Sequence, residues 1–273
     1  MRKRVYIALA VLLVILAGVV AWQVLRLREP VYQGKRLSVW LEHLERLDEA
    51  ATRGNQNERD DAEQAIRHIG TNALPILIER LPAQNTRLKQ LMMAWANKHE
   101  RFPLHFKSAE QRRIEAVCGY EALGSLASAQ VPRLIDILDN DLFLDARQAA
   151  ARVLGYIGPE ARLAVPALFR ATKDTDDSVR INALWALGEI RPDPQLTIPV
   201  LVVGLDDAEP FVRENAALAL RRYGPEARAA VPALLRTLDT TNAVGMEQQR
   251  FHATVRSALK NIDPEAAAKA GVK

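Results

Sequence analysis

Cysteine and aromatic residues are scarce in this sequence of 273 residues. The single cysteine, Cys118, excludes an intramolecular disulfide, and its place on an apolar helical stripe predicts a small buried side chain rather than a reactive thiol. Aromatic residues make up only 5% of the chain, whereas alanine, leucine and arginine, all strong helix formers, are abundant. The composition therefore predicts an almost entirely α-helical protein.

Motifs that mark catalytic and cofactor sites are also missing. The sequence contains no phosphate-binding glycine loop, no Gly-x-Ser-x-Gly motif, no His-Glu-x-x-His motif and no cysteine–histidine cluster. The histidines follow no spacing that metal ligands would require; they are His43, His68, His99, His105 and His252. We therefore expect no metal, no cofactor and no enzymatic activity.

Positive charge is confined to two parts of the chain. The formal net charge is +4, but residues 1–28 and residues 86–113 each carry a net excess of five positive charges, so the remainder is acidic. A protein that binds nucleic acid needs a continuous basic groove to follow the phosphates. We therefore expect no nucleic-acid partner.

Residues 5–25 form the one long apolar run of the sequence. At ~1.5 Å per residue a helix of this length reaches about 31 Å, enough to cross the hydrocarbon core of a bilayer. Tyr6 and Trp22 fall near its two ends, where aromatic rings favour the headgroup region, and more positive charge precedes the run than follows it. Residues 1–28 are thus predicted to be a signal anchor with the N-terminus inside; a cleaved signal peptide is the alternative.

Two columns of residues recur at intervals of 33 or 34 positions. Apolar residues between them have helical spacing, so each interval predicts a pair of helices. Glycines at or near the end of the first helix (Gly124, Gly158, Gly188 and Gly224) suit a helix C-cap, and the prolines suit the first turn of the second helix. We interpret the columns as structural, with a binding row as the alternative for the arginines. The columns are Arg113, Arg147, Arg180 and Arg213, and Pro132, Pro166, Pro199 and Pro232.

The repeated phrases Val-Arg-x-Asn-Ala-x-x-Ala-Leu-Gly and Ala-Val-Pro-Ala-Leu resemble the HEAT-like repeats of bacterial proteins, including the short class also found in phycobilisome lyases. The resemblance covers about residues 56–262. It implies an α-solenoid of about five helix pairs, and in such repeats the recurring arginine supports the turns and the packing of neighbours. Because lyases share this repeat, the resemblance leaves a lyase-type enzyme or enzyme-accessory protein acting on an exported substrate as the alternative function.

Three further segments flank or interrupt the repeats. Residues 29–55 are predicted to be a juxtamembrane segment with a capping helix, in which Ser38 is the N-cap and Trp40, Leu41, Leu44 and Leu47 form an apolar stripe. Residues 263–273 are interpreted as a tail. Residues 86–113 form a basic insertion, which is either a contact patch for an acidic partner or anionic headgroups, or an extended helix pair whose Leu88, Leu91, Met92 and Trp95 face the core.

Together these patterns predict a membrane-anchored scaffold that presents a concave surface to a protein or peptide partner. The membrane is expected to be the bacterial inner membrane, crossed once, with the repeats on the periplasmic side. The concave surface is assigned to positions of the second helices that point away from their apolar stripes: Arg133, Asp136, Ala167, Arg170, Val200, Val203, Ala233 and Arg236.

Overall fold

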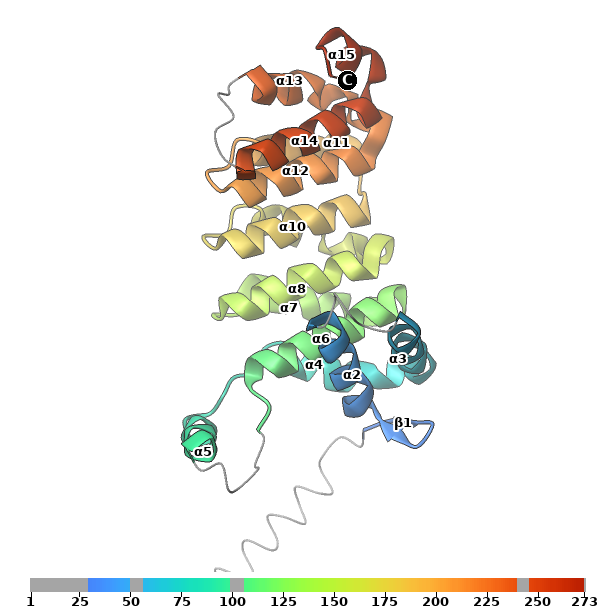
Figure 1. The fold of residues 1–273 in the computed structure, drawn as a ribbon, viewed down its shortest axis with the longest axis vertical. Coiled ribbons are helices and arrows are strands. Elements are labelled where there is room, and N and C mark those ends of the chain that lie inside the picture. Colours follow the sequence, from blue (N-terminus) through green and yellow to red (C-terminus); the bar gives the residue numbers. More distant parts are fainter. Residues whose placement is uncertain (1–28, 50–55, 99–105, 240–245, 273) are drawn as a thin grey trace, which may run out of the picture.

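The computed structural model describes residues 29–49, 56–98, 106–239 and 246–272, in which helices stack into one elongated array (Figure 1). The described chain begins with a small antiparallel hairpin of β1 (Val31–Tyr32) and β2 (Lys35–Arg36). Its helices are α2 (Leu37–Glu49), α3 (Gln56–Ile69), α4 (Leu74–Arg80), α5 (Arg87–Lys98), α6 (Ala109–Leu123), α7 (Val131–Asn140), α8 (Leu144–Ile157), α9 (Val165–Ala171), α10 (Asp177–Ile190), α11 (Pro194–Gly204), α12 (Pro210–Tyr223), α13 (Val231–Asp239), α14 (Met246–Ile262) and α15 (Pro264–Lys269).

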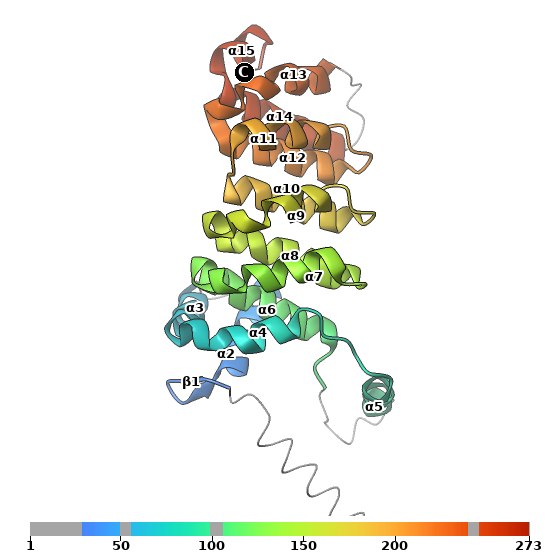
Figure 2. The ribbon, with the colours of Figure 1, turned by 180° about the vertical axis from the view of Figure 1, so that it is seen from behind.

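The helices form two layers. Helices α8, α10, α12 and α14 lie side by side in one layer, whereas α7, α9, α11 and α13 lie in the other (Figures 1 and 2). Each first helix is followed by a second helix, as in α8 with α9 or α10 with α11, and α14 closes the stack against α12 and α13. The predicted all-α solenoid is confirmed for the described residues, apart from the short hairpin.

The connections within three pairs share one geometry. Gly124, Gly158 and Gly224 end α6, α8 and α12 with positive φ values of 54°, 74° and 55°, a region that favours glycine. Short 3-10 helices follow at Gly124–Gln130, Gly158–Ala164 and Gly224–Ala230, and the next α-helix carries its proline in the first turn. These three caps and prolines are as predicted.

The pair α10–α11 departs from that geometry. Gly188 lies inside α10, and Arg191 takes the left-handed conformation at the helix end. Helix α11 begins early at Pro194, because the Asp193 side chain accepts a hydrogen bond from the Gln195 amide at 2.9 Å, so Pro199 lies inside the helix rather than in its first turn. Gly188 instead permits close packing, since a Cβ there would lie 3.0 Å from Ala219 of α12.

The N-terminal helix α2 packs against the first helices of the stack. Helix α2 lies against α3 and α6, and Trp40, Leu41 and Leu44 are buried. Ser38 was predicted to be the N-cap, but α2 begins one residue earlier, at Leu37. The Ser38 hydroxyl instead donates a hydrogen bond to Glu29 at 2.7 Å. At the other end, residues predicted to be a tail contain the helix α15, whose N-cap is Asp263.

A cluster of ion pairs joins the flank to the first repeats. We call it the ion-pair cluster; its members are Glu29, Glu42, Arg80, Lys107 and Glu115. Glu115 is fully buried in α6, where it is paired with Arg80 of α4 at 2.6 Å and with Lys107. Arg80 also lies 3.8 Å from Glu29, and Lys107 lies 3.0 Å from Glu42 of α2. The cluster thus connects the start of the described chain with α2, α4 and α6.

The basic insertion differs from the expected helix pair. Its helix α5 stands beside the stack (Figures 1 and 2), and Leu88, Leu91, Met92 and Trp95 are exposed rather than turned to the core. The prediction that these four residues face the core is therefore wrong. Two hydrogen bonds hold α5 to the segment that leads into α6: Lys89 Nζ donates to the Lys107 carbonyl at 2.5 Å, and the Ala109 amide donates to the Asn85 side chain, just before α5, at 2.9 Å.

The apolar run at residues 5–25 lies outside the described residues, so its predicted membrane span is not visible here. Among residues 29–272 that the structure describes, no helix combines the length and apolar character needed to cross a membrane.

Candidate binding site

The second-helix layer carries the surface predicted from the sequence. The side chains of Ala167 and Ala233 are buried, and Val200 is half-buried against the core, so these three do not form an open apolar surface. Val203 remains, with 70% of its surface exposed. This burial depends on how each second helix packs against the rest of the stack, as α9 does on α10 and α13 on α14, which helical spacing within one repeat cannot reveal.

The charged residues of this face pair with carboxylates. Arg133 pairs with Asp136 of the same helix. Arg170 of α9 lies 2.6 Å from Asp139 of α7, and Arg236 of α13 lies 2.8 Å from Asp206. A ligand carboxylate would have to compete with these aspartates. The eight predicted residues thus include ion-paired side chains and a single well-exposed apolar side chain, Val203.

The recurring arginines lie at the turns between repeats. Arg147 binds Asp174 through two hydrogen bonds of 3.0 Å and also donates to the Asp141 carbonyl at 3.1 Å. Arg180 repeats the arrangement, with two bonds of 3.0 Å to Asp207 and one of 3.0 Å to the Asp174 carbonyl. Each guanidinium therefore holds its own turn and the next one together.

The two ends of this ladder differ from its middle. Arg113 pairs with Asp145 at 3.0 Å and donates to the Leu81 carbonyl at 3.0 Å. Arg213 donates to the carbonyls of Asp207 and Ala208 at 2.8 Å, while its guanidinium carbon lies 5.5 Å from the Phe251 ring centre. All four side chains are thus engaged within the stack.

Electrostatics at the turns follow from these bonds. Burial acts to raise the pKa of Asp174, but the hydrogen bonds from Arg147 and from the Asp176 amide outweigh it, so the pKa lies below its ordinary value. The pKa of Asp207 is lowered in the same way by Arg180 and the Glu209 amide, against the effect of burial. Both turns therefore keep charged carboxylates at neutral pH.

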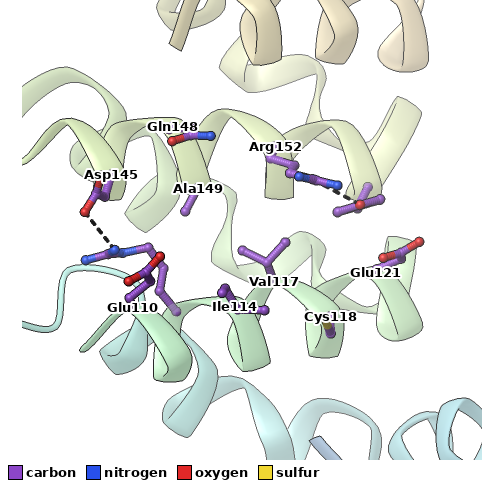
Figure 3. A pocket seen from close by; sticks show the side chains of 11 residues that line it. Glu110, Ile114, Val117, Cys118, Glu121, Asp145, Gln148, Ala149 and Arg152 are labelled. Carbon is purple, nitrogen blue, oxygen red and sulfur yellow. Dashed lines mark hydrogen bonds and ion pairs between the residues drawn. The ribbon is translucent and has the colours of Figure 1, made fainter. Parts of the chain in front are cut away.

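A cleft lies between α6 and α8 of the first-helix layer. It has a volume of about 310 Å³ and is lined by Glu110, Arg113, Ile114, Val117, Cys118, Glu121, Asp145, Gln148, Ala149, Arg152 and Tyr156. Figure 3 shows Ile114, Val117 and Ala149 between two polar ends, with Asp145 and Glu110 at one and Arg152 and Glu121 at the other. Cys118 is buried, as predicted.

The cleft exists because one helix pair lacks a close packing contact. Between α8 and α10, Gly155 leaves room for the Trp185 ring, which fills the space between the helices. At the corresponding repeat positions, α6 has Glu121 and α8 has Arg152. Two charged side chains cannot interlock as glycine and tryptophan do, so the outer edges of α6 and α8 stay apart. Comparison of these positions between neighbouring repeats is the sequence signal that could indicate the cleft.

Hydrogen bonds order the polar end near Tyr156. Arg152 Nε donates to the Tyr156 hydroxyl at 3.2 Å, and Arg59 of α3 lies 3.8 Å from Glu121. Burial raises the pKa of Tyr156 above its ordinary value. The nearby Arg152 acts to lower this pKa, and Glu121 acts to raise it. The Tyr156 hydroxyl therefore stays protonated at neutral pH, and Arg152 is the exposed cation of this end.

The arrangement suits recognition more than chemistry. Glu121 lies eleven positions after Glu110 on α6, so the cleft extends over about 16 Å, enough for a short peptide segment. An apolar floor between charged ends fits a segment with an apolar side chain flanked by charges. Within the part of the chain that the structure describes, no group of three or more His, Cys, Asp or Glu residues is placed to hold a metal ion.

Comparisons with known proteins bear on the fold. A model of HEAT repeats matches residues 131–202, from the start of α7 into α11. No curated protein matches the chain. Solved structures similar to it include an engineered protein, with 21% identity, a TM-score of 0.40 and coverage of 80% of this chain and 97% of that one. Another is a computationally designed armadillo repeat protein for modular peptide recognition, with 18% identity, a TM-score of 0.42, and coverage of 84% and 100%.

Proposed function

We propose that this repeat protein is a membrane-anchored scaffold that binds a protein partner. Residues 5–25 cross the bacterial inner membrane with the N-terminus in the cytoplasm, and the solenoid lies in the periplasm. The partner contributes an extended segment that enters the cleft between α6 and α8. The observation that carries the proposal is the cleft itself, an apolar floor with Ile114 exposed between charged ends, on a stack of repeats.

The chemistry of the cleft defines the partner segment. Ile114, with 42% of its surface exposed, offers an apolar contact in the middle. Arg152 would receive a carboxylate, because the bond that the structure gives its Nε goes to a neutral hydroxyl. Glu110 at the opposite end is exposed and suits a cation. The expected segment is therefore one apolar side chain between an acidic and a basic residue.

Membrane topology is tested by fusing reporters to the C-terminus of the full chain. Alkaline phosphatase is expected to be active and green fluorescent protein dark, because the former needs export and the latter does not fluoresce when exported unfolded. Comparing both activities with the amount of each fusion controls for expression. Fluorescence with an inactive phosphatase would place the repeats in the cytoplasm and overturn the proposed location.

Partner binding is tested by placing a photocrosslinking amino acid at Ile114 in the full chain. We expect a discrete crosslinked product in cells, and we expect it to disappear in the Arg152→Glu variant, because the charge that receives the partner carboxylate is reversed. The matched control is the same crosslinker at Val203, an exposed valine of the second-helix layer. A product from Val203 and none from Ile114 would transfer the site to the second-helix layer and contradict the cleft.

A further inference from the structure

Helix α5 presents an apolar face to solvent. Leu88 and Leu91 have 69% and 64% of their surfaces exposed, and Met92 has 42%. The three lie at positions i, i+3 and i+4, so they share one side of the helix. An exposed face of this kind on a helix marks a contact with something outside the fold.

The charged residues of α5, and the exposed ones of the hairpin at the same end of the stack, are basic. Helix α5 contains no acidic residue, and Arg87 is exposed at its start. Lys35 and Arg36 are exposed in the β1–β2 hairpin, which lies at the same end of the stack as α5, opposite the C-terminus, but on the other side of the stack (Figures 1 and 2). Glu29 and Glu42, the acidic residues nearby, are neutralised within the ion-pair cluster by Arg80 and Lys107. A basic helix with an apolar face, at an end of the stack that carries further exposed cations, suits the surface of an anionic bilayer.

Chain length places this end of the stack near the membrane. The apolar run ends at residue 25 and the described chain begins at Glu29, so at most about 14 Å of extended chain separates them. Glu29 is fixed to Arg80, Arg80 to Glu115 and Glu115 to Lys107, whose carbonyl accepts the Lys89 hydrogen bond from α5. A chain anchored through residues 5–25 thus holds α5 next to the same bilayer.

We infer that α5 is an interfacial helix that docks its Leu88–Leu91–Met92 face into an anionic lipid surface, beside the anchor. This inference rests on the proposed membrane anchor for its placement. A second anchoring point would fix the tilt of the solenoid, because a single helix and a short connection leave the stack free to swing. The cleft between α6 and α8 would then have a defined height and direction above the membrane.

The test uses the full chain with Cys118→Ala, reconstituted into vesicles of phosphatidylcholine and phosphatidylglycerol. An environment-sensitive fluorophore is attached at Leu91→Cys, and at Gln90→Cys as the matched control, since Gln90 is an exposed residue outside the apolar face. We expect a blue-shifted emission and quenching by acyl-chain nitroxide lipids at position 91 but not at 90. In a Leu88→Gln, Met92→Gln background the docked population falls about tenfold or more.

Each outcome decides the inference. An alkaline wash removes chains that are not anchored in the bilayer. If the chains resist this wash but the probe at position 91 stays in water, lipid docking of α5 is contradicted and the proposed anchor is supported. Chains that are removed by the wash but show the lipid-dependent shift at neutral pH support the docking and contradict the anchor. Shielding without nitroxide quenching, with energy transfer between labelled chains, would assign the face to a second copy and overturn the inference. Chains that never associate with vesicles overturn both.

Discussion

Replacing Glu115 with alanine is expected to lower the free energy of unfolding by about 3–5 kcal/mol. Its carboxylate is fully buried and pairs with both Arg80 and Lys107. The variant removes the buried partner that Arg80 and Lys107 share and leaves them with only the outer carboxylates of Glu29 and Glu42. Because solenoid repeats depend on their neighbours, the loss should be largest in the N-terminal helices.

Urea denaturation of the full chain in detergent, followed by circular dichroism, measures the effect, and hydrogen exchange resolved by segment locates it. The matched control is Glu110→Ala, an exposed glutamate of the same helix, for which a change within about 0.5 kcal/mol is expected. Faster exchange should appear in α2, α4 and α6 but not in α12 or α14. Equal stabilities of the two variants would show that the ion-pair cluster contributes nothing to the fold.

Replacing Gly155 with valine is expected to cost about 1–3 kcal/mol through overpacking. A Cβ at this position would lie 2.3 Å from Trp185 Cζ3 and 3.1 Å from the Ala186 Cα atom. The Trp185 ring cannot simply turn away, because it also makes an edge-on contact with Tyr156 at 5.1 Å between ring centres. Helices α8 and α10 must therefore separate.

A double-mutant cycle identifies the cause. In a Trp185→Ala background the ring that collides with the new side chain is gone, so the valine should cost less than it does in the natural chain. Thermal and urea unfolding of the four chains give the coupling energy. A cost that is the same in both backgrounds would show that backbone effects, and not the contact with Trp185, explain the loss.

The repeats were predictable because one residue type dictates each of their parts. Glycine at a helix end, proline in a first turn and apolar residues at helical spacing each act within a few positions, so Gly158, Pro166 and their equivalents could be placed without knowing the neighbours. Pro199 could not, because the Asp193 cap that starts α11 early replaces the glycine turn of the other pairs.

Features between helices were harder to predict. Ala167 is buried by its neighbours, and the cleft depends on which residues face each other across α6 and α8, namely Glu121 and Arg152 where the next pair has Gly155 and Trp185. Helical spacing identifies the apolar side of a helix such as α5 but not whether another helix covers it. The solvent exposure of Leu88 and Leu91 therefore required the three-dimensional structure.

The arginine ladder also sets a rule for changes in the length of the array. Asp174 accepts Arg147 through its side chain and Arg180 through its carbonyl, and Asp207 does the same for Arg180 and Arg213. Every turn is therefore both the end of one unit and the start of the next. Gain or loss of one whole repeat between equivalent positions restores each of these bonds. An insertion can keep them only if it leaves both turns of an arginine in place, as the basic insertion does for Arg113, which still donates to the Leu81 and Ala83 carbonyls and pairs with Asp145. Duplication of complete repeats therefore lengthens the array without loss of any bond in the ladder.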